Sequence, residues 1–193
     1  MEIDFQAIQM LEASVYGAEN FRTAESLESL HKAWPHGFTV LWDEDADPPR
    51  MMAVGDVWCL NHSWFQTLCN GAVREESLSI SHICKPSKQD KSQCWYIASM
   101  IVAPEYRAQG IFNKLAQAVW EIIKKYSAPS YTLMGVASSE AGWRILRRWA
   151  FKPWVETPGL QNDRIDLRPR YIKIMKCAKP CQGPTDCSSA PLS

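Results

Sequence analysis

The sequence predicts an α/β fold built as one domain. The chain has 193 residues, an ordinary length for a single domain. Its apolar residues recur at helical spacing in some segments and form short continuous runs of strand length in others. In the second half of the chain, the expected elements alternate as strand, loop, helix, strand, helix and strand. This alternation is typical of a sheet covered by helices.

The N-terminal elements are two helices followed by a hairpin. Apolar residues recur at helical spacing from Phe5 to Val15, and Gly17 ends that run. A second helix is expected from Thr23 to the residue before Pro35. The spacing of the apolar residues then becomes that of strands, and a proline-containing turn separates two strand-like segments. The two expected hairpin strands cover 38–42 and 51–60.

Residues 61–93 are the least readable stretch, and they predict a short helix at 62–68, an alternating strand at 77–83 and a polar loop at 85–93. The signals are sharper from residue 95 onward. A nearly continuous apolar run at 95–102 is typical of a strand buried on both faces, and Pro104 ends it. The later expected elements are a helix at 111–126, a strand at 131–137, a helix at 139–150 and closing strands at 151–156 and 171–175.

Charge is balanced overall but unevenly distributed. The chain has 21 basic and 21 acidic residues, so no net field draws it toward nucleic acid or an anionic membrane. Residues 1–50 carry ten acids and three bases, whereas residues 101–193 carry seven acids and fourteen bases. This polarity suits an anionic ligand at the C-terminal half and a cationic ligand nearer the N-terminal half, although segregated solvated faces explain it equally well. No apolar run approaches the roughly 20 residues of a membrane helix.

The cysteines indicate a reducing compartment. Seven cysteines is an odd number, and the N-terminus lacks the pattern of a signal peptide, so we expect a cytoplasmic protein with reduced thiols. Cys177, Cys181 and Cys187 lie among prolines and glycine without a nearby histidine, so no metal site is expected. We expect one domain over 1–176 and a flexible tail over 177–193.

The segment from Val102 to Leu115 carries the clearest chemistry. A buried strand runs into a short loop, and the loop opens directly into a helix whose first amides have no partner within the helix. Gly110 allows a ligand to approach the backbone closely, and Arg107 adds a cation. Such a loop is suited to hold phosphate, although an ordinary strand-to-helix turn would have the same sequence features.

Two motifs at this spacing resemble those of the GCN5-related N-acetyltransferase (GNAT) superfamily. The first is Arg107-Ala108-Gln109-Gly110-Ile111-Phe112, preceded by Val102-Ala103-Pro104. The second runs from Ser139 to Phe151, and the resemblance is best over 94–156. It implies a single mixed central sheet flanked by helices, with a splayed central strand near 94–103. It also implies an enzyme that moves an acetyl group from acetyl-CoA to a primary amine by direct attack.

The resemblance assigns the cofactor site residue by residue. It implies that the loop amides and the Arg107 side chain hold the pyrophosphate, that the central strand pairs with the pantetheine arm, and that Ser139 also contacts the cofactor. A strand amide would polarise the thioester carbonyl. The implied acetyl-CoA contacts are Met100, Ile101, Val102, Arg107, Ala108, Gln109, Gly110, Ile111, Phe112 and Ser139.

The catalytic groups are less clearly indicated. Leu146 stands where the family commonly has a tyrosine that protonates the leaving thiolate, and Phe112 replaces a small residue. We take Tyr96 as the candidate acid, with Tyr106, Ser139 and a water molecule as alternatives. His82 is the preferred candidate base because its ordinary pKa suits neutral pH. The other candidate bases are Asp56, Glu75 and Glu76.

Two functions from different classes therefore remain open. The first is the N-acyltransferase, with a basic amine as acceptor, no metal, and a monomer or homodimer as the active form. The alternative is a non-catalytic acyl-CoA-binding or regulatory module of the same fold, which Leu146 and Phe112 leave open. Nucleic-acid binding is not expected, because no motif for it is present.

Overall fold

The computed structural model describes residues 2–17, 22–137, 139–153 and, for its backbone course, 170–176. The predicted tail over 177–193 and the predicted domain boundary at 176/177 lie outside these residues. The elements are α1 (Phe5–Tyr16), α2 (Ala24–Ala33), η1 (Pro35–Gly37), β1 (Phe38–Asp43), β2 (Arg50–Leu60), α3 (His62–Cys69), η2 (Glu75–Ser77), η3 (Ile80–His82), β3 (Cys94–Val102), η4 (Pro104–Tyr106), α4 (Ile111–Tyr126), β4 (Ser130–Val136), α5 (Glu140–Arg148), β5 (Lys152–Pro153) and β6 (Arg170–Lys176).

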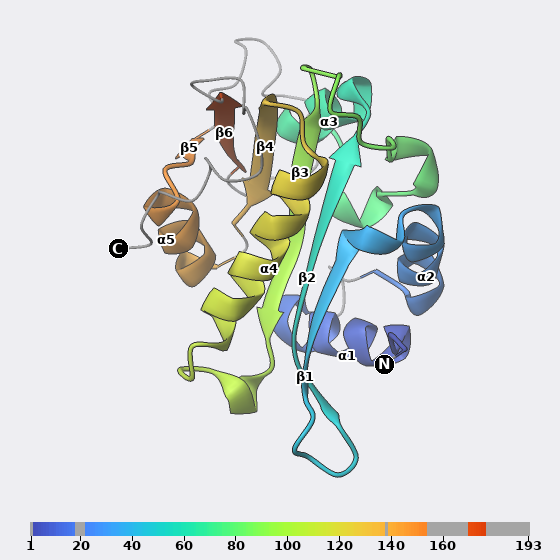
Figure 1. The fold of residues 1–193 in the computed structure, drawn as a ribbon, viewed down its shortest axis with the longest axis vertical. Helices are drawn as coiled ribbons and strands as arrows, with labels where there is room; N and C mark the ends of the chain where they lie inside the picture. Colours follow the sequence, from blue (N-terminus) through green and yellow to red (C-terminus); the bar gives the residue numbers. More distant parts are fainter. Residues whose placement is uncertain (1, 18–21, 138, 154–169, 177–193) are drawn as a thin grey trace.

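The strands form one mixed sheet in the order β1-β2-β3-β4-β6-β5. Only β3 and β4 run parallel, and every other neighbouring pair is antiparallel. The parallel pair needs a crossover, which α4 supplies by packing across the sheet in front of β2 and β3 (Figure 1). The predicted α/β fold with a mixed sheet is confirmed.

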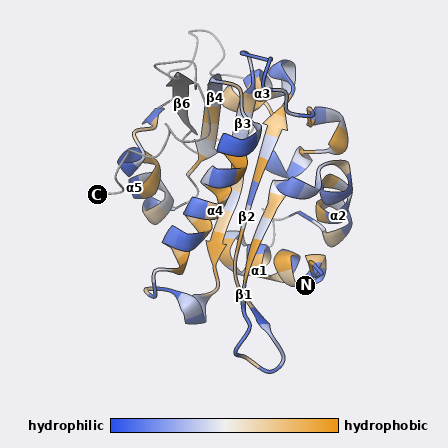
Figure 2. Cartoon of the chain, viewed as in Figure 1, coloured by the Kyte–Doolittle hydropathy of each residue, from blue (hydrophilic) through white to orange (hydrophobic). Residues whose placement is uncertain are grey.

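Helix α4 covers one face of the sheet and α1 contacts the other. The side of α4 toward the sheet is apolar and its outer side is hydrophilic, as Figure 2 shows. It packs closely on Gly55 of β2, where an added Cβ would lie 3.1 Å from the Val119 side chain. Successive strand residues face opposite sides. Ser99 of β3 therefore faces away from α4, and Tyr16 of α1 contacts it there.

Local capping explains where α1 begins and ends. The Asp4 side chain accepts a hydrogen bond from the Ala7 amide at 3.0 Å, which satisfies one of the unpaired amides of the first turn. Gly17 ends the helix at φ +86°, a positive φ that glycine adopts without steric cost. The end of α1 places Tyr16 beside the central strand.

The central strand β3 separates from β4 halfway along its length. The two strands pair from Cys94↔Thr132 to Ile97↔Gly135, and within the described residues their pairing ends there. A β-bulge lies at the same place, because Asp56 pairs with Ser99 while Val57 pairs with Ile97, which leaves Ala98 as the extra residue. The predicted splay near 94–103 is therefore present, and it begins at the bulge.

One predicted strand is wrong. Residues 77–83 form the turns η2 and η3 instead of a strand, and only Ile83 makes an isolated bridge, to Leu60. The Ser79 amide donates to His82 Nδ1 at 3.1 Å, and such local bonds compete with a strand ladder. Of the alternating apolar residues, Leu78 is buried but Ile80 is 56% exposed. The alternation of apolar and polar residues at 77–83 therefore does not correspond to the two faces of a strand.

Candidate active site

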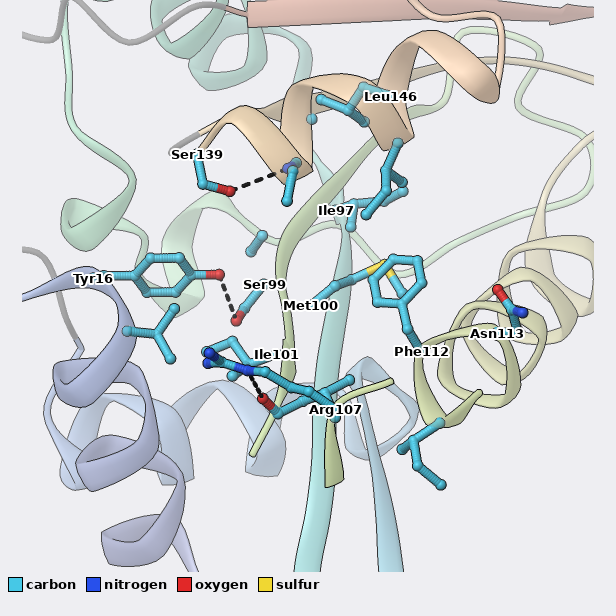
Figure 3. A pocket seen from close by; sticks show the side chains of 18 of the residues that line it. Tyr16, Ile97, Ser99, Met100, Ile101, Arg107, Phe112, Asn113, Ser139 and Leu146 are labelled. Carbon is cyan, nitrogen blue, oxygen red and sulfur yellow. Dashed lines mark hydrogen bonds between the residues drawn. The ribbon is translucent and has the colours of Figure 1, made fainter. Parts of the chain in front are cut away.

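The splay between β3 and β4 opens a cavity of ≈ 690 Å³. It follows the open edge of β3 from Ile97 to Val102, between α4 and α5, and the C-terminal end of α1 closes one side (Figure 3). Its volume is that of an ordinary small-molecule site. Strand backbone and apolar side chains make up most of its lining, which suits a long ligand lying along the strand.

The loop between β3 and α4 forms one end of the cavity. Ala108 and Gly110 adopt left-handed conformations at φ +61° and +76°, which turn successive amides toward one side as in an anion-binding nest. Gly110 is also the N-cap of α4, where no side chain caps the helix. A Cβ built on Gly110 meets nothing within 4 Å, so the space beside it is open to a ligand. These features create a site for an anion at a helix N-terminus.

The predicted cofactor residues lie along this cavity, with one exception. Nine of the ten line it, and Gln109 does not. The Gln109 side chain donates to the Glu105 carbonyl at 2.9 Å. Arg107 Nε donates to the Val102 carbonyl at 3.2 Å, which holds this exposed side chain against the end of β3. Ser139 accepts a hydrogen bond from the Gly142 amide at 3.1 Å and so caps α5 at the cavity wall.

Leu146 and Phe112, two of the residues that depart from the family pattern, both face the cavity. Leu146 is buried, and a Cβ on Gly135 would lie 3.0 Å from its side chain, so α5 packs directly on β4. Phe112 does not fill the loop. Its ring stacks on Trp149, with centroids 6.0 Å apart and planes at 23°, and thereby joins the start of α4 to the end of α5. The wall that α5 forms near the splay is therefore apolar at Leu146, the position where the family commonly has a tyrosine hydroxyl.

A buried ionic network lies behind the bulge. The Arg22 guanidinium contacts Glu12 and donates to both carboxylate oxygens of Asp56, at 2.6 and 3.2 Å. Trp58 Nε1 also donates to Asp56, at 2.6 Å. Burial raises the pKa of Glu12, whereas the charges of Asp56 and Glu12 raise the pKa of Arg22 against the effect of its burial. Glu12 and Asp56 share the single positive charge of Arg22. The network therefore favours binding of a further cation nearby.

A second, much smaller hollow joins this network to the cavity. Its volume is ≈ 10 Å³, about the room of one water molecule. Tyr16, Ala98 and Ser99 line both spaces, so the two meet at the bulge. Its remaining lining residues are Glu12, Arg22, Glu75 and Glu76. Three of the predicted base candidates, Asp56, Glu75 and Glu76, thus lie at or directly behind this hollow.

The two preferred catalytic candidates lie elsewhere. His82 does not line the cavity. Its ring stacks on Trp64 at 4.7 Å between centroids, and its pKa is lowered by burial. Tyr96 is fully buried and donates its hydroxyl to Glu75 behind the strand, so it does not line the cavity either. Tyr106 lines the other end, with its hydroxyl donated to Asp43 at 2.8 Å.

Tyr16 and Ser99 were not found from the sequence. Their hydroxyl oxygens lie 3.4 Å apart, with Tyr16 pointing across the cavity toward β3 (Figure 3). Burial raises the pKa of Tyr16 to about 12. Ser99 had a signal, because it is the one serine or threonine within the apolar run of β3. Tyr16 had none, since only the packing of α1 against the sheet brings it to the strand.

Two kinds of site are not found in the described part of the chain. No group of three or more His, Cys, Asp or Glu side chains there could hold a metal ion. Within the same residues, no helix has the length and apolar character required to span a membrane.

Solved structures share this fold at low sequence identity. The GNAT-like decarboxylase GphF in complex with isobutyryl-CoA matches with a TM-score of 0.60 and 13% identity, over 88% of this chain and 93% of that one. A chain of the NatC complex bound to Gag peptide and CoA matches with a TM-score of 0.58 and 13% identity, over 91% and 92%. A Staphylococcus aureus acetyltransferase of the GNAT family matches with a TM-score of 0.55 and 12% identity, over 91% and 98%.

At these identities, the structural matches show the fold alone, and they include a decarboxylase as well as acetyltransferases. No curated protein sequence matches the chain significantly. The family itself is shown by the sequence match, which extends from residue 8 to residue 151 and so includes every residue that lines the cavity described above. The chain belongs to the acetyltransferase (GNAT) family.

Proposed function

We propose that this protein is an N-acyltransferase that moves an acetyl group from acetyl-CoA to a basic primary amine by direct attack. Membership of the acetyltransferase family supports acyl transfer. The observation that carries the finer proposal is the open edge of β3, which leads from a helix N-terminus at one end to an acidic hollow at the other. This arrangement offers an anion site, a path for an extended arm and a site for a cation in one line.

The residues at the α4 end fit the phosphate groups of CoA. The amides of Gly110, Ile111 and Phe112 lie at the uncapped start of α4, and the Arg107 guanidinium lies at the mouth of the cavity. Charge-assisted hydrogen bonds from such donors are the strong ones. The open space beside Gly110 accommodates a phosphate oxygen, whereas any side chain there would compete for it.

The open edge of β3 fits the arm and the thioester. From Val102 to Ala98 the strand spans about 13 Å at 3.3 Å per residue. Beyond Ile97 its edge toward β4 is available, so an amide-containing arm can pair with it as an added strand would. A strand amide near the bulge would donate to the thioester carbonyl and stabilise the charge that develops on its oxygen.

The acidic hollow supports a cationic acceptor. Glu12, Glu75 and Glu76 line it, and Asp56 lies behind it, with Arg22 as the base among them. An ammonium group entering at the bulge must lose a proton before it can attack. Glu12, whose pKa is raised by burial, is better matched to accept a proton near neutral pH than an exposed carboxylate would be. None of the four cysteines in the described chain lines the cavity, which agrees with attack by the amine itself.

Acetyl transfer is tested by incubating the protein with acetyl-CoA and a matched panel of acceptors. The panel holds a peptide with a free N-terminus, the same peptide with a blocked N-terminus and one lysine, a polyamine, and an acidic peptide. We expect free CoA release and a mass gain of one acetyl group for at least one basic acceptor. Its KM should rise with salt, because the Debye length falls from about 10 Å at 0.1 M to about 3 Å at 1 M.

Two outcomes would contradict this proposal. Tight CoA binding without acetylation of any amine would favour the non-catalytic acyl-CoA-binding module. Efficient acetylation of the acidic peptide, with a KM independent of salt, would contradict the basic acceptor alone. The cytoplasmic location and the monomer or homodimer expected from the sequence stay proposals, which fractionation and sedimentation would test.

A further inference from the structure

We propose that the hydroxyls of Tyr16 and Ser99 form a proton relay from the attacking nitrogen to the leaving sulfur. This inference rests on the proposed acyl transfer and names the chain's own groups for its last proton movement. The carrying observation is the juxtaposition of the two hydroxyls, 3.4 Å apart, at the bulge where the cavity and the acidic hollow meet.

The position of the reacting atoms follows from the two ends of the cavity. Phosphates held at Gly110 place the start of the arm beside Val102, and the arm then follows β3 toward Ala98. The thioester thus lies at the bulge. Of the hydroxyl side chains that line the described cavity, Tyr16 and Ser99 are the pair at this end.

The remaining hydroxyls of the cavity are committed to local structure. Tyr106 donates to Asp43 at 2.8 Å at the phosphate end. Ser14 donates to the Leu11 carbonyl of its own helix at 2.8 Å. Ser139 caps α5 by accepting from Gly142. Leu146, on the wall opposite, has no proton to give.

The relay balances without a separate acid. The amine, already neutral after losing one proton to the acidic hollow, attacks the carbonyl carbon, and a carbon–nitrogen bond forms as the carbon–sulfur bond breaks. The nitrogen's excess proton passes to the Ser99 oxygen, the Ser99 proton to the Tyr16 oxygen, and the Tyr16 proton to the sulfur. Nitrogen has then lost one proton and sulfur has gained one, and both hydroxyls are restored.

The electrostatics favour a concerted relay over a free phenolate. Burial raises the pKa of Tyr16 to about 12, with smaller contributions in the same direction from Glu75, Glu12 and Asp56, while the Ser99 hydrogen bond lowers it. A thiol has a pKa near 8.5. Full transfer from an isolated Tyr16 to the thiolate would therefore be uphill, whereas transfer coupled to the nitrogen's proton returns Tyr16 to its neutral form in the same step.

The test compares Tyr16→Phe with Tyr131→Phe. Tyr131 is a matched control because it is a buried tyrosine whose pKa is also raised to about 12, but it lies on β4 and does not line the cavity. We expect Tyr16→Phe to lower kcat by about 10²-fold or more, as for general acid–base groups, with the dissociation constant of CoA changed less than about threefold. Tyr131→Phe should leave both near the wild-type values.

A second measurement does not depend on turnover. The pKa of the thiol of bound CoA is read from thiolate absorbance in the protein–CoA complex. A hydrogen bond from Tyr16 to the sulfur should make that pKa about one unit lower in the wild type than in Tyr16→Phe, since hydrogen bonds to charged groups are the strong ones. Ser99→Ala should lower kcat to a similar extent, and the double variant little further, because the two groups act as one unit.

The outcomes separate this inference from the proposed function. An unchanged thiol pKa and a kcat within about threefold of wild type in Tyr16→Phe would overturn the relay while acyl transfer stands. Equal losses in Tyr16→Phe and Tyr131→Phe would also overturn it, because they would reflect the fold. A wild type that binds CoA without transferring acetyl would overturn the proposed function, and the thiol pKa would still report whether Tyr16 meets the sulfur.

Discussion

The two ends of the cavity are built in different ways. At the phosphate end, one continuous segment from Val102 to Phe112 supplies the strand edge, the loop and the helix N-terminus, and most of the donors are backbone amides. At the bulge end, the polar groups are side chains from separate elements, with Tyr16 from α1, Ser99 from β3 and Glu75 from η2. The first site depends on local conformation and the second on tertiary packing.

This contrast predicts how mutations affect each end of the cavity. A site made of backbone amides loses ligand affinity when a new side chain occupies the ligand's space, whereas the fold is retained. A site of buried charges depends on every partner, because removing one leaves the others uncompensated in a low-dielectric interior. Removing one of the buried charges behind the bulge should therefore cost stability first, and changes at the loop should cost affinity first.

The largest expected effect on stability is at Arg22. Replacing Arg22 with Met leaves Glu12 and Asp56 buried, at 2% and 1% exposure, without their counter-ion. We expect the free energy of unfolding to fall by about 3–5 kcal/mol, measured by urea denaturation. The control is Lys32→Met, which removes an exposed pair with Glu28 and should change it by less than about 1 kcal/mol. Equal effects of the two variants would refute the contrast.

The next effect is on affinity, at Gly110. Asp at this position places a carboxylate where phosphate oxygens are proposed to bind, and Asn is the neutral control of the same shape that also tolerates a left-handed φ. We expect Gly110→Asp to weaken CoA binding by about 10²-fold and Gly110→Asn by clearly less, as measured by calorimetry. Similar affinities for the two folded variants would show that no anion is held there.

The smallest effect is expected at His82. Gln in its place keeps an acceptor for the Ser79 amide and loses the stacking on Trp64. Because His82 does not line the cavity, kcat should stay within about threefold of the wild type. A loss of 10²-fold or more with CoA binding intact would restore His82 as the base.

The sequence by itself determined the elements and the phosphate end. Strong apolar periods predicted α1, α2, the hairpin, β3 and α4, because each of these buries a continuous face. The loop from Arg107 to Phe112 was readable because its features are local: a strand end, a glycine and a helix start in direct succession. A site made from neighbouring backbone groups leaves its pattern in neighbouring residues.

Only the tertiary structure decided the bulge end. The alternation at 77–83 is typical of a strand, but the Ser77 and Ser79 side chains form local hydrogen bonds and Ile80 stays exposed. The segment therefore turns, and Glu75 and Glu76 line the hollow. Tyr16 reaches Ser99 across 83 positions of sequence. The contact between Tyr16 and Ser99 depends on how α1 packs on the sheet and on the point at which β3 separates from β4. Neither feature produces a local pattern of apolar residues in the sequence.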